Sequence, residues 1–379
     1  MHCGIEFEYL MVDTTGPLAG RVRDFSNLDY PVIRSILENK PGRDDPGLAT
    51  GDLGIKSGYW YLEGDERFHE DGRFHTLAVK GVEIRTPPRP GIAEAIESLL
   101  SIEKQLIPVL ADHGLGLAVV GFNPVHPGYT FTPPLNPWEM DLRRRHRSYD
   151  GSLVSTMSYG PDINLSMPGW LPDQCLDVAR KLNHYSPFIV PFSFSSPFSG
   201  GGLWPGCSKR TYERAGRRPA VKLFLDANGL HELRSLSGLV HPARLPGEAG
   251  RIEFKAFDAM PSLAVLTACC HLLVGVCLAD DLTGRSEGCD PALYRRGAMA
   301  GFNDDDIRRG AAALLDKARI ALDRTGTVSG TDALAPLMQL LRERRTPAED
   351  LVASWQETGL AYRPGAFVQH LNAEAYDYA

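Results

Sequence analysis

Charged or polar side chains alternate with large apolar ones in four short stretches of this chain. The stretches are residues 4–9, 82–85, 162–166 and 251–258. Successive side chains of a β-strand point to opposite faces, so Glu6 and Glu8 share one face, and so do Glu253 and Lys255. Two like charges side by side on a sheet gain nothing from each other, whereas a bound cation stabilises both. We therefore expect four strands that line one polar cavity.

The same alternation has a second interpretation, and the sequence leaves it open. An antiparallel sheet with one solvated face also alternates polar and apolar residues, and it needs no functional site. The apolar partners Ile5, Phe7 and Phe254 are large, which indicates that helices cover the other face. The fold class that follows is α+β, with a curved, mainly antiparallel sheet whose concave face is polar and whose convex face is covered by helices.

Composition limits the class of protein. The chain has 379 residues, of which 43% are hydrophobic, enough for a substantial core in one large domain or two ordinary ones. The net charge of -7 argues against a general nucleic-acid binder. A basic run at residues 143–147 is best interpreted as the solvated face of a helix.

The cysteines and the apolar segments point to a cytoplasmic protein. Seven cysteines form an odd set without a Cys-x-x-Cys pair, so we expect reduced thiols and neither a zinc cluster nor a disulfide framework. A charged strand near the N-terminus leaves no room for a signal peptide. The most apolar stretch, residues 263–278, is short for a membrane span and carries His271, so we expect a buried helix and no membrane partner.

Periodicity and turn residues place the remaining elements. Predicted strands are residues 59–62, 74–86, 116–122 and 155–167. Predicted helices are residues 31–38, 92–113, 139–150, 172–185 and 261–281. Two further helices are predicted, one that Asn303 caps and one that has a capping box at Thr346 and ends at Gly359. Residues 17–55 are predicted to form a long excursion that can act as a lid, residues 63–66 an acidic loop, and residues 123–138 an extended loop. Pro187 is expected to end the helix before it.

A serine- and glycine-rich segment at residues 193–202 precedes three cations, Lys209, Arg210 and Arg214. Such a loop can hold phosphate groups, but it is equally consistent with a plain linker. No G-x-x-x-x-G-K-[ST] pattern supports the first interpretation.

Five motifs in the same order resemble those of the second type of glutamate–cysteine ligase and its carboxylate–amine ligase relatives. They are Gly-Ile-Glu-Phe-Glu at residues 4–8, Val-Glu-Ile-Arg-Thr-Pro at 82–87, Gly-Pro-Asp-Ile-Asn-Leu-Ser at 160–166, Ser-Pro-Phe at 196–198 with Ser-Lys-Arg at 208–210, and Ile-Glu-Phe-Lys at 252–255. The resemblance covers most of residues 1–285. It implies the catalytic-domain fold of glutamine synthetase.

The resemblance also implies an ATP-dependent ligase that uses Mg²⁺ or Mn²⁺ and joins a small-molecule carboxylate to an amine through an acyl phosphate. The implied metal ligands are Glu6, Glu8, Glu83, Asp162 and Glu253. The implied catalytic residues are Glu253, Lys255 and Arg210, with Arg210 on phosphate or on a substrate carboxylate. The implied nucleotide-binding residues are Arg85, Asn164, Ser208 and Lys209.

Two positions depart from the family pattern. Relatives commonly carry a histidine where this chain has Asp162 and an arginine where it has Lys255. Aspartate is still a hard oxygen ligand, and lysine still neutralises phosphate, although as a point charge without a bidentate fork. We expect the chemistry to be retained, but the choice of substrate stays open and cysteine as the acceptor does not follow.

The whole chain, residues 1–379, is predicted to be one ligase domain with a helical portion from about residue 290, and a homo-oligomer is possible. The favoured function is amide formation on the γ-carboxylate of glutamate or of a similar amino acid. Two other hypotheses stay open, a guanidino kinase on the same broad fold and a non-catalytic binding protein.

Overall fold

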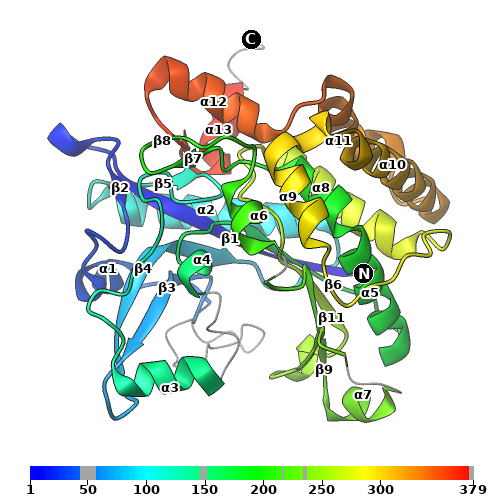
Figure 1. Cartoon of the computed structure of the whole chain (residues 1–379), viewed down its shortest axis with the longest axis horizontal. Coiled ribbons are helices and arrows are strands. Elements are labelled where there is room, and N and C mark those ends of the chain that lie inside the picture. The colour runs from blue at the N-terminus through cyan, green and yellow to red at the C-terminus, as the bar shows by residue number, and fades with distance from the viewer. Residues whose placement is uncertain (43–56, 146–151, 216, 234–236, 375–379) are drawn as a thin grey trace.

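The computed structural model describes residues 1–42, 57–145, 152–215, 217–233 and 237–374 (Figure 1). Its main sheet is curled into a mostly antiparallel half-barrel. In spatial order the strands are β10 (Val240–Pro242), β9 (Val221–Leu225), β11 (Arg251–Phe254), β6 (Pro161–Ser166), β1 (His2–Asp13), β4 (Phe74–Arg85) and β3 (Trp60–Phe68). Only the β10–β9 pair of this series is parallel. The predicted fold class is confirmed.

β1 organises the sheet because it is long enough to pair on both sides and then to continue into a second region. Its first half lies between β6 and β4. Its second half pairs with β5 (Leu115–Val119) and with the short β2 (Val22–Arg23), and β5 pairs in turn with β12 (Arg363–Pro364). Strands distant in sequence therefore meet on β1.

The register brings the predicted polar residues to one face. Glu6 lies opposite both Asp162 on β6 and Arg85 on β4, and Glu8 lies opposite Glu83. Glu253 on β11 lies opposite Asn164 on β6. Residues directly opposed in an antiparallel pair point to the same side of the sheet. The alternation found in the sequence thus describes a single polar face.

The other face of the sheet is apolar and covered by helices. Ile5, Phe7 and Ile163 are fully buried there. The helices against the sheet include α2 (Ile92–Ala111) on β1, α5 (Pro172–Ile189) on β9, and α8 (Leu263–Leu278), which packs on α2 and α5. α8 is apolar on all sides because α10 (Asp305–Thr325) and α11 (Gly330–Glu343) cover it from outside (Figure 1). The prediction of a buried helix is correct, and among the described residues no helix is long and apolar enough to cross a membrane.

The other helices connect or flank these layers. They are α1 (Tyr30–Leu37), α3 (Pro137–Arg145), α4 (Ser152–Ser155), α6 (Lys209–Arg214), α7 (Ala227–Glu232), α9 (Pro291–Ala300), α12 (Pro347–Thr358) and α13 (Phe367–Glu374). The predicted capping box of α12 is present, with the Thr346 amide donating to Glu349 Oε2 at 2.8 Å. Gly359 follows with a φ of 76°, the left-handed conformation that ends this helix.

The structure corrects several predicted boundaries. Residues 63–66 are not a loop, since β3 continues to Phe68 with a bulge at Glu63 and Gly64, where a Cβ on Gly64 would lie 2.1 Å from the Ala78 carbonyl oxygen. α5 runs past Pro187 to Ile189, because a proline in the last turn removes one hydrogen bond only. The strand expected over residues 155–167 begins at Pro161, and α4 precedes it.

Other differences are smaller. The helix after residue 300 is capped by Asp304, not Asn303. The segment at residues 193–202 is not an irregular linker, since it holds the end of a 3-10 helix (Val190–Ser193) and a two-stranded ribbon, β7 (Phe198–Ser199) with β8 (Gly202–Leu203). The predicted lid at residues 17–55 and the helix at 139–150 lie partly outside the described residues.

Candidate active site

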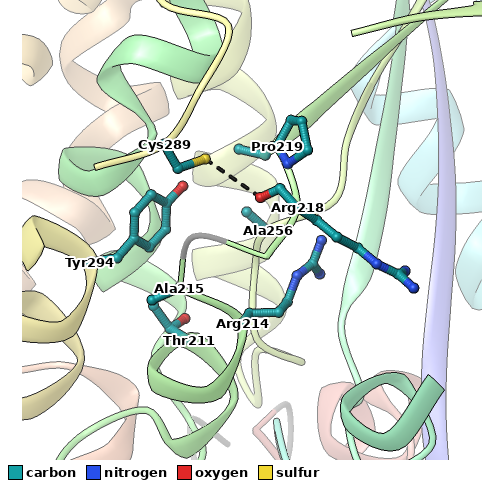
Figure 2. Close-up of a pocket in the computed structure, with 9 residues that line it drawn as sticks. Thr211, Arg214, Ala215, Arg218, Pro219, Ala256, Cys289 and Tyr294 are labelled. Carbon is teal, nitrogen blue, oxygen red and sulfur yellow. Dashed lines mark hydrogen bonds between the residues drawn. The ribbon is translucent and has the colours of Figure 1, made fainter. Parts of the chain in front are cut away.

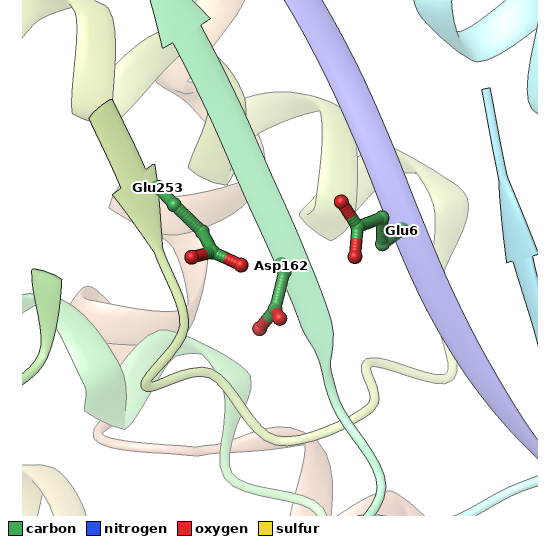
Figure 3. A group of neighbouring side chains, drawn as sticks. All are labelled: Glu6, Asp162 and Glu253. Atoms are coloured by element: carbon green, nitrogen blue, oxygen red, sulfur yellow. The ribbon is translucent and has the colours of Figure 1, made fainter. Parts of the chain in front are cut away.

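Three carboxylates from adjacent strands converge on the polar face and form what we call the first carboxylate cluster. Its members are Glu6 on β1, Asp162 on β6 and Glu253 on β11, and one oxygen of each lies within 4.8 Å of the others (Figure 3). Burial and repulsion from Glu253 and Asp162 raise the pKa of Glu6. Three predicted metal ligands are thus brought together in one place.

Lys255, the first residue after β11, lies within this cluster. Its Nζ is 2.5 Å from Asp162 Oδ2 and 2.9 Å from Glu253 Oε1. Burial alone lowers the pKa of Lys255, but attraction to Asp162 and Glu253 outweighs it and leaves the pKa raised. Burial raises the pKa of Glu253, but attraction to Lys255 and Lys222 outweighs burial, so the pKa of Glu253 is lowered. Lys255 is therefore an ammonium ion held between two carboxylates.

The remaining side of the first cluster is supported by Asn164 and Arg251. Asn164 donates from Nδ2 to Glu6 Oε1 at 3.1 Å and accepts at Oδ1 from Arg251 at 2.6 Å. The Arg251 guanidinium lies 4.0 Å from the ring centre of Phe224 and 3.8 Å from Glu6 Oε1. Asn164, predicted to bind the nucleotide, thus orients Glu6 by a direct hydrogen bond. Arg251 is a site residue that was not predicted.

A second carboxylate cluster lies on the neighbouring strands and is formed by Glu8 on β1, Glu63 on β3 and Glu83 on β4. Glu8 is held on both sides, by Lys80 Nζ at 2.5 Å and by the Gly160 amide at 2.9 Å. Lys80 is buried and also donates to the Ser158 carbonyl oxygen at 2.8 Å. The two predicted ligands Glu8 and Glu83 are therefore separate from the first cluster.

Two members of this region were missed in the sequence. Glu63 was assigned to a loop, although it stands two residues after Tyr61, whose hydroxyl donates to Glu83 Oε1 at 2.7 Å. Extending the predicted strand through residues 61–63 would have identified Glu63, because residues two apart in a strand point to the same face. Lys80 stands alone among apolar residues of β4 and gave no signal. Arg85 was predicted, and it lies opposite Glu6 with its guanidinium 5.2 Å from the ring centre of Tyr61.

Arg210, a predicted catalytic residue, lies beside the backbone of Lys255. Its side chain is almost fully buried and donates to the carbonyl oxygens of Ala256 at 2.8 Å and Lys255 at 3.3 Å. Burial and the neighbouring Arg214 lower its pKa to about 10. These contacts fix the backbone beside Lys255, and the contact of Arg210 with phosphate or a substrate carboxylate stays a prediction.

Ser208 and Lys209 also have structural partners. Ser208 caps α6 by accepting from the Thr211 amide at 3.0 Å, and it donates to the buried Asp258 at 3.0 Å. Lys209 pairs with Glu213 at 2.6 Å along the same helix. These contacts anchor α6, and nucleotide binding by Ser208 and Lys209 stays a prediction.

A small pocket lies beside Ala256, the residue after Lys255 (Figure 2). Its walls include Ala215, Ala256, Cys289 and Tyr294, with Arg214 at its edge. Arg214 donates to the Lys255 carbonyl oxygen at 2.5 Å. Burial raises the pKa of the Cys289 thiol, which makes it a poor nucleophile.

Comparison with known proteins defines the class to which this fold and site belong. Residues 3–237 match the family model of glutamate-cysteine ligase family 2, and the chain belongs to this family. It is therefore a member of the carboxylate–amine ligases, as its motifs predicted.

Two solved structures share the fold. One is a bifunctional glutathione synthetase from Pasteurella multocida, with a TM-score of 0.55 and 13% identity over 99% of this chain and 52% of that one. The chain thus spans about half the length of the Pasteurella protein. The other is a glutamate–cysteine ligase from Francisella tularensis in complex with AMP, with a TM-score of 0.54 and 11% identity over 95% of this chain and 86% of that one. A comparison with curated proteins gave no match.

Proposed function

We propose that this protein is an ATP-dependent ligase that joins the γ-carboxylate of glutamate, or of a similar amino acid, to an amine. The observation that carries the proposal is the polar face of the sheet, where two clusters of three carboxylates flank β1 and Lys255 lies within one of them. The substrates proposed are small molecules. The cytoplasmic location, the single domain and the homo-oligomer stay predictions.

The proposed reaction has two steps. A carboxylate oxygen of the donor attacks the γ-phosphorus of ATP, the bond to the bridging oxygen breaks, and ADP leaves. The amine nitrogen then attacks the carbonyl carbon of the acyl phosphate, loses a proton, and phosphate leaves as the amide forms. Negative charge is transferred in both steps, so fixed cations that face the phosphate lower the barrier. Lys255, whose ammonium group lies within the first carboxylate cluster, would supply such a charge.

The second carboxylate cluster fits a divalent metal ion. Its three carboxylates offer hard oxygen donors on adjacent strands, as Mg²⁺ and Mn²⁺ require. Glu8, Glu63 and Glu83 would hold the ion, which when bound would neutralise charge on the phosphates. In this second cluster Glu8 is held by a lysine, Lys80, whereas in the first cluster two of the three carboxylates accept hydrogen bonds from Lys255.

The experiment that tests the ligase proposal replaces the amine with hydroxylamine. An acyl phosphate reacts with hydroxylamine to give a hydroxamate. The protein is incubated with ATP, Mg²⁺, hydroxylamine and glutamate, and in parallel with a panel of other amino acids and carboxylic acids. We expect hydroxamate and ADP in equal amounts with at least one donor. The variant Glu97→Gln, an exposed change on α2, serves as the matched control and should react like the wild type.

Each outcome separates the three hypotheses. A guanidino kinase would release ADP with a guanidine acceptor and would form no hydroxamate. A binding protein would consume no ATP. Hydroxamate from a donor other than glutamate would change the donor assignment only, whereas none across the whole panel would overturn the ligase proposal.

A further inference from the structure

The first carboxylate cluster contains a cation that belongs to the chain itself. Lys255 Nζ donates to Asp162 Oδ2 at 2.5 Å and to Glu253 Oε1 at 2.9 Å. A divalent ion such as Mg²⁺ needs carboxylate oxygens at about 2.0–2.1 Å in near-octahedral geometry. An ammonium group and a divalent ion cannot share the space between the same two oxygens.

Other basic side chains lie beside this cluster. Arg251 lies 3.8 Å from Glu6 Oε1 and 2.9 Å from Glu248 Oε1, and Lys222 lies 3.9 Å from Glu253 Oε2. A divalent ion added to the cluster would bring two positive charges next to the Lys255 ammonium group, and Coulomb repulsion from Lys255 would oppose it.

The backbone of Lys255 is also fixed from the side away from the carboxylates. Arg210 and Arg214 both donate to the Lys255 carbonyl oxygen, at 3.3 Å and 2.5 Å. Arg214 and Ala256, the residue after Lys255, line the same small pocket (Figure 2). The ammonium group is therefore held in place by its own carboxylate partners and by two buried or half-buried arginines behind its backbone.

We propose that Lys255 is the resident cation of the first carboxylate cluster and excludes a divalent metal ion from it. Divalent ions then bind this face of the sheet only at other oxygens. The inference rests on the proposed function in one respect only, that Mg²⁺ or Mn²⁺ is taken as the metal.

The test counts bound Mn²⁺ without any substrate. Purified wild type, Lys255→Met and Lys255→Arg are titrated with Mn²⁺ at neutral pH, and free Mn²⁺ is followed by electron paramagnetic resonance. Lys255→Met keeps the length of the side chain but removes its charge, so it should bind one more Mn²⁺ per chain than the wild type. Lys255→Arg keeps the charge and should bind the same number as the wild type. Adding Glu253→Gln to Lys255→Met should remove the extra ion.

The same number of Mn²⁺ ions in the wild type and in Lys255→Met would overturn the inference. A second measurement does not depend on the folding of Lys255→Met. In the wild-type background, Glu253→Gln should leave the number of bound Mn²⁺ ions unchanged, because no divalent ion uses Glu253. Loss of one ion in this variant would also overturn the inference.

These results are independent of the ligase assay. If no hydroxamate forms but Lys255→Met gains an ion, the proposed function fails and the inference stands. If hydroxamate forms and the ion counts are equal, the inference fails and the proposed function stands.

Discussion

At the scale of single residues, the surroundings of Glu253 and Lys255 explain why both side chains are charged. Glu253 is 5% exposed, and one of its oxygens accepts from Lys255 while the other lies 3.9 Å from Lys222. Removing one partner of a buried charge pair leaves the other charge without compensation, which is costly for function and stability. The two residues should therefore behave as a unit.

Glu253→Gln should lower the rate of hydroxamate formation by about 10²-fold or more, because Lys255 loses the carboxylate that positions it. The measurement is the initial rate at saturating ATP and Mg²⁺, with circular dichroism to show that the variant is folded. Glu97→Gln is the control for a lost surface carboxylate. Wild-type turnover in folded Glu253→Gln would show that the residue is only a structural partner of Lys255.

Lys255→Arg should retain most of the activity, since the positive charge next to Asp162 is kept. Lys255→Ala should lose about 10²–10³-fold in rate, the effect of removing one electrostatic stabiliser of about 2.7–4 kcal/mol. Both rates are compared at the Mg²⁺ concentration that saturates the wild type. Full activity of Lys255→Ala would remove Lys255 from the proposed mechanism.

At the scale of elements, the polar face is held in place by helices and strands whose ends have specific anchors. Glu139 at the start of α3 ties this helix to β3. It accepts from Arg67 Nε at 2.8 Å and from the Phe68 amide at 2.9 Å, and both side chains of the ion pair are buried. Burial raises the pKa of Glu139, but the hydrogen bonds from Arg67 and from the backbone outweigh it, so the pKa is lowered.

Because the pKa of Glu139 is lower in the folded state, its ionised form stabilises the fold above the ordinary glutamate pKa of about 4.3. This stabilisation is lost as the pH falls through the lower, folded-state pKa. Glu139→Gln should therefore destabilise the anchor at pH 7 by about 3–5 kcal/mol, as for a broken buried pair, and the difference from wild type should shrink below about pH 4. Hydrogen exchange of the Phe68 amide measures this destabilisation. An equal difference between the variant and the wild type at pH 7 and below about pH 4 would contradict the role of the ionised Glu139.

The N-terminus of α10 gives a matched pair of variants. Asp304 accepts from the amides of Asp306 at 3.0 Å and Ile307 at 3.1 Å, whereas Asn303, its exposed neighbour, is not the cap. Asp304→Ala should lower the free energy of unfolding by about 1 kcal/mol, with up to about 2 kcal/mol in a favourable case. Asn303→Ala should change it by less than about 0.5 kcal/mol. Urea unfolding of both variants checks this, and an equal loss in the two would contradict the capping geometry.

At the scale of the whole molecule, the two faces of the sheet have different roles. One face carries the charged residues of the candidate site, and the other is packed against helices and stabilises the fold. Phe254 lies between Glu253 and Lys255 in the sequence but points to the apolar face, where it is 1% exposed and its ring centre lies 4.7 Å from that of Phe257. Neighbouring residues of β11 thus belong to two different environments.

Phe254→Ala should lower the free energy of unfolding by about 3–5 kcal/mol, the cost of a large cavity in a packed core. Below its melting temperature the variant should keep the same number of bound Mn²⁺ ions as the wild type, because no ligand atom is removed. Denaturant unfolding and Mn²⁺ titration are the two measurements. A large loss of stability in Glu253→Gln together with none in Phe254→Ala would reverse the assignment of the faces.

The sequence by itself determined which residues share the polar face and which family the chain belongs to. Period-two alternation is a local property of a strand, so Glu6 and Glu8, or Glu253 and Lys255, can be assigned to one face without knowing their neighbours. The same reasoning correctly predicted the apolar helix α8 and the capping box at Thr346, since both depend on residues close in the chain.

Only the tertiary structure decided how the carboxylates group and what each cation contacts. Glu6 meets Asp162, and Glu8 meets Glu63 and Glu83, through the register of strands that are far apart in sequence. Arg210 is buried behind Lys255 because α6 packs there, which no local pattern encodes. Local periodicity fixes the face of a strand to which a side chain points, whereas long-range strand pairing and burial fix its partner.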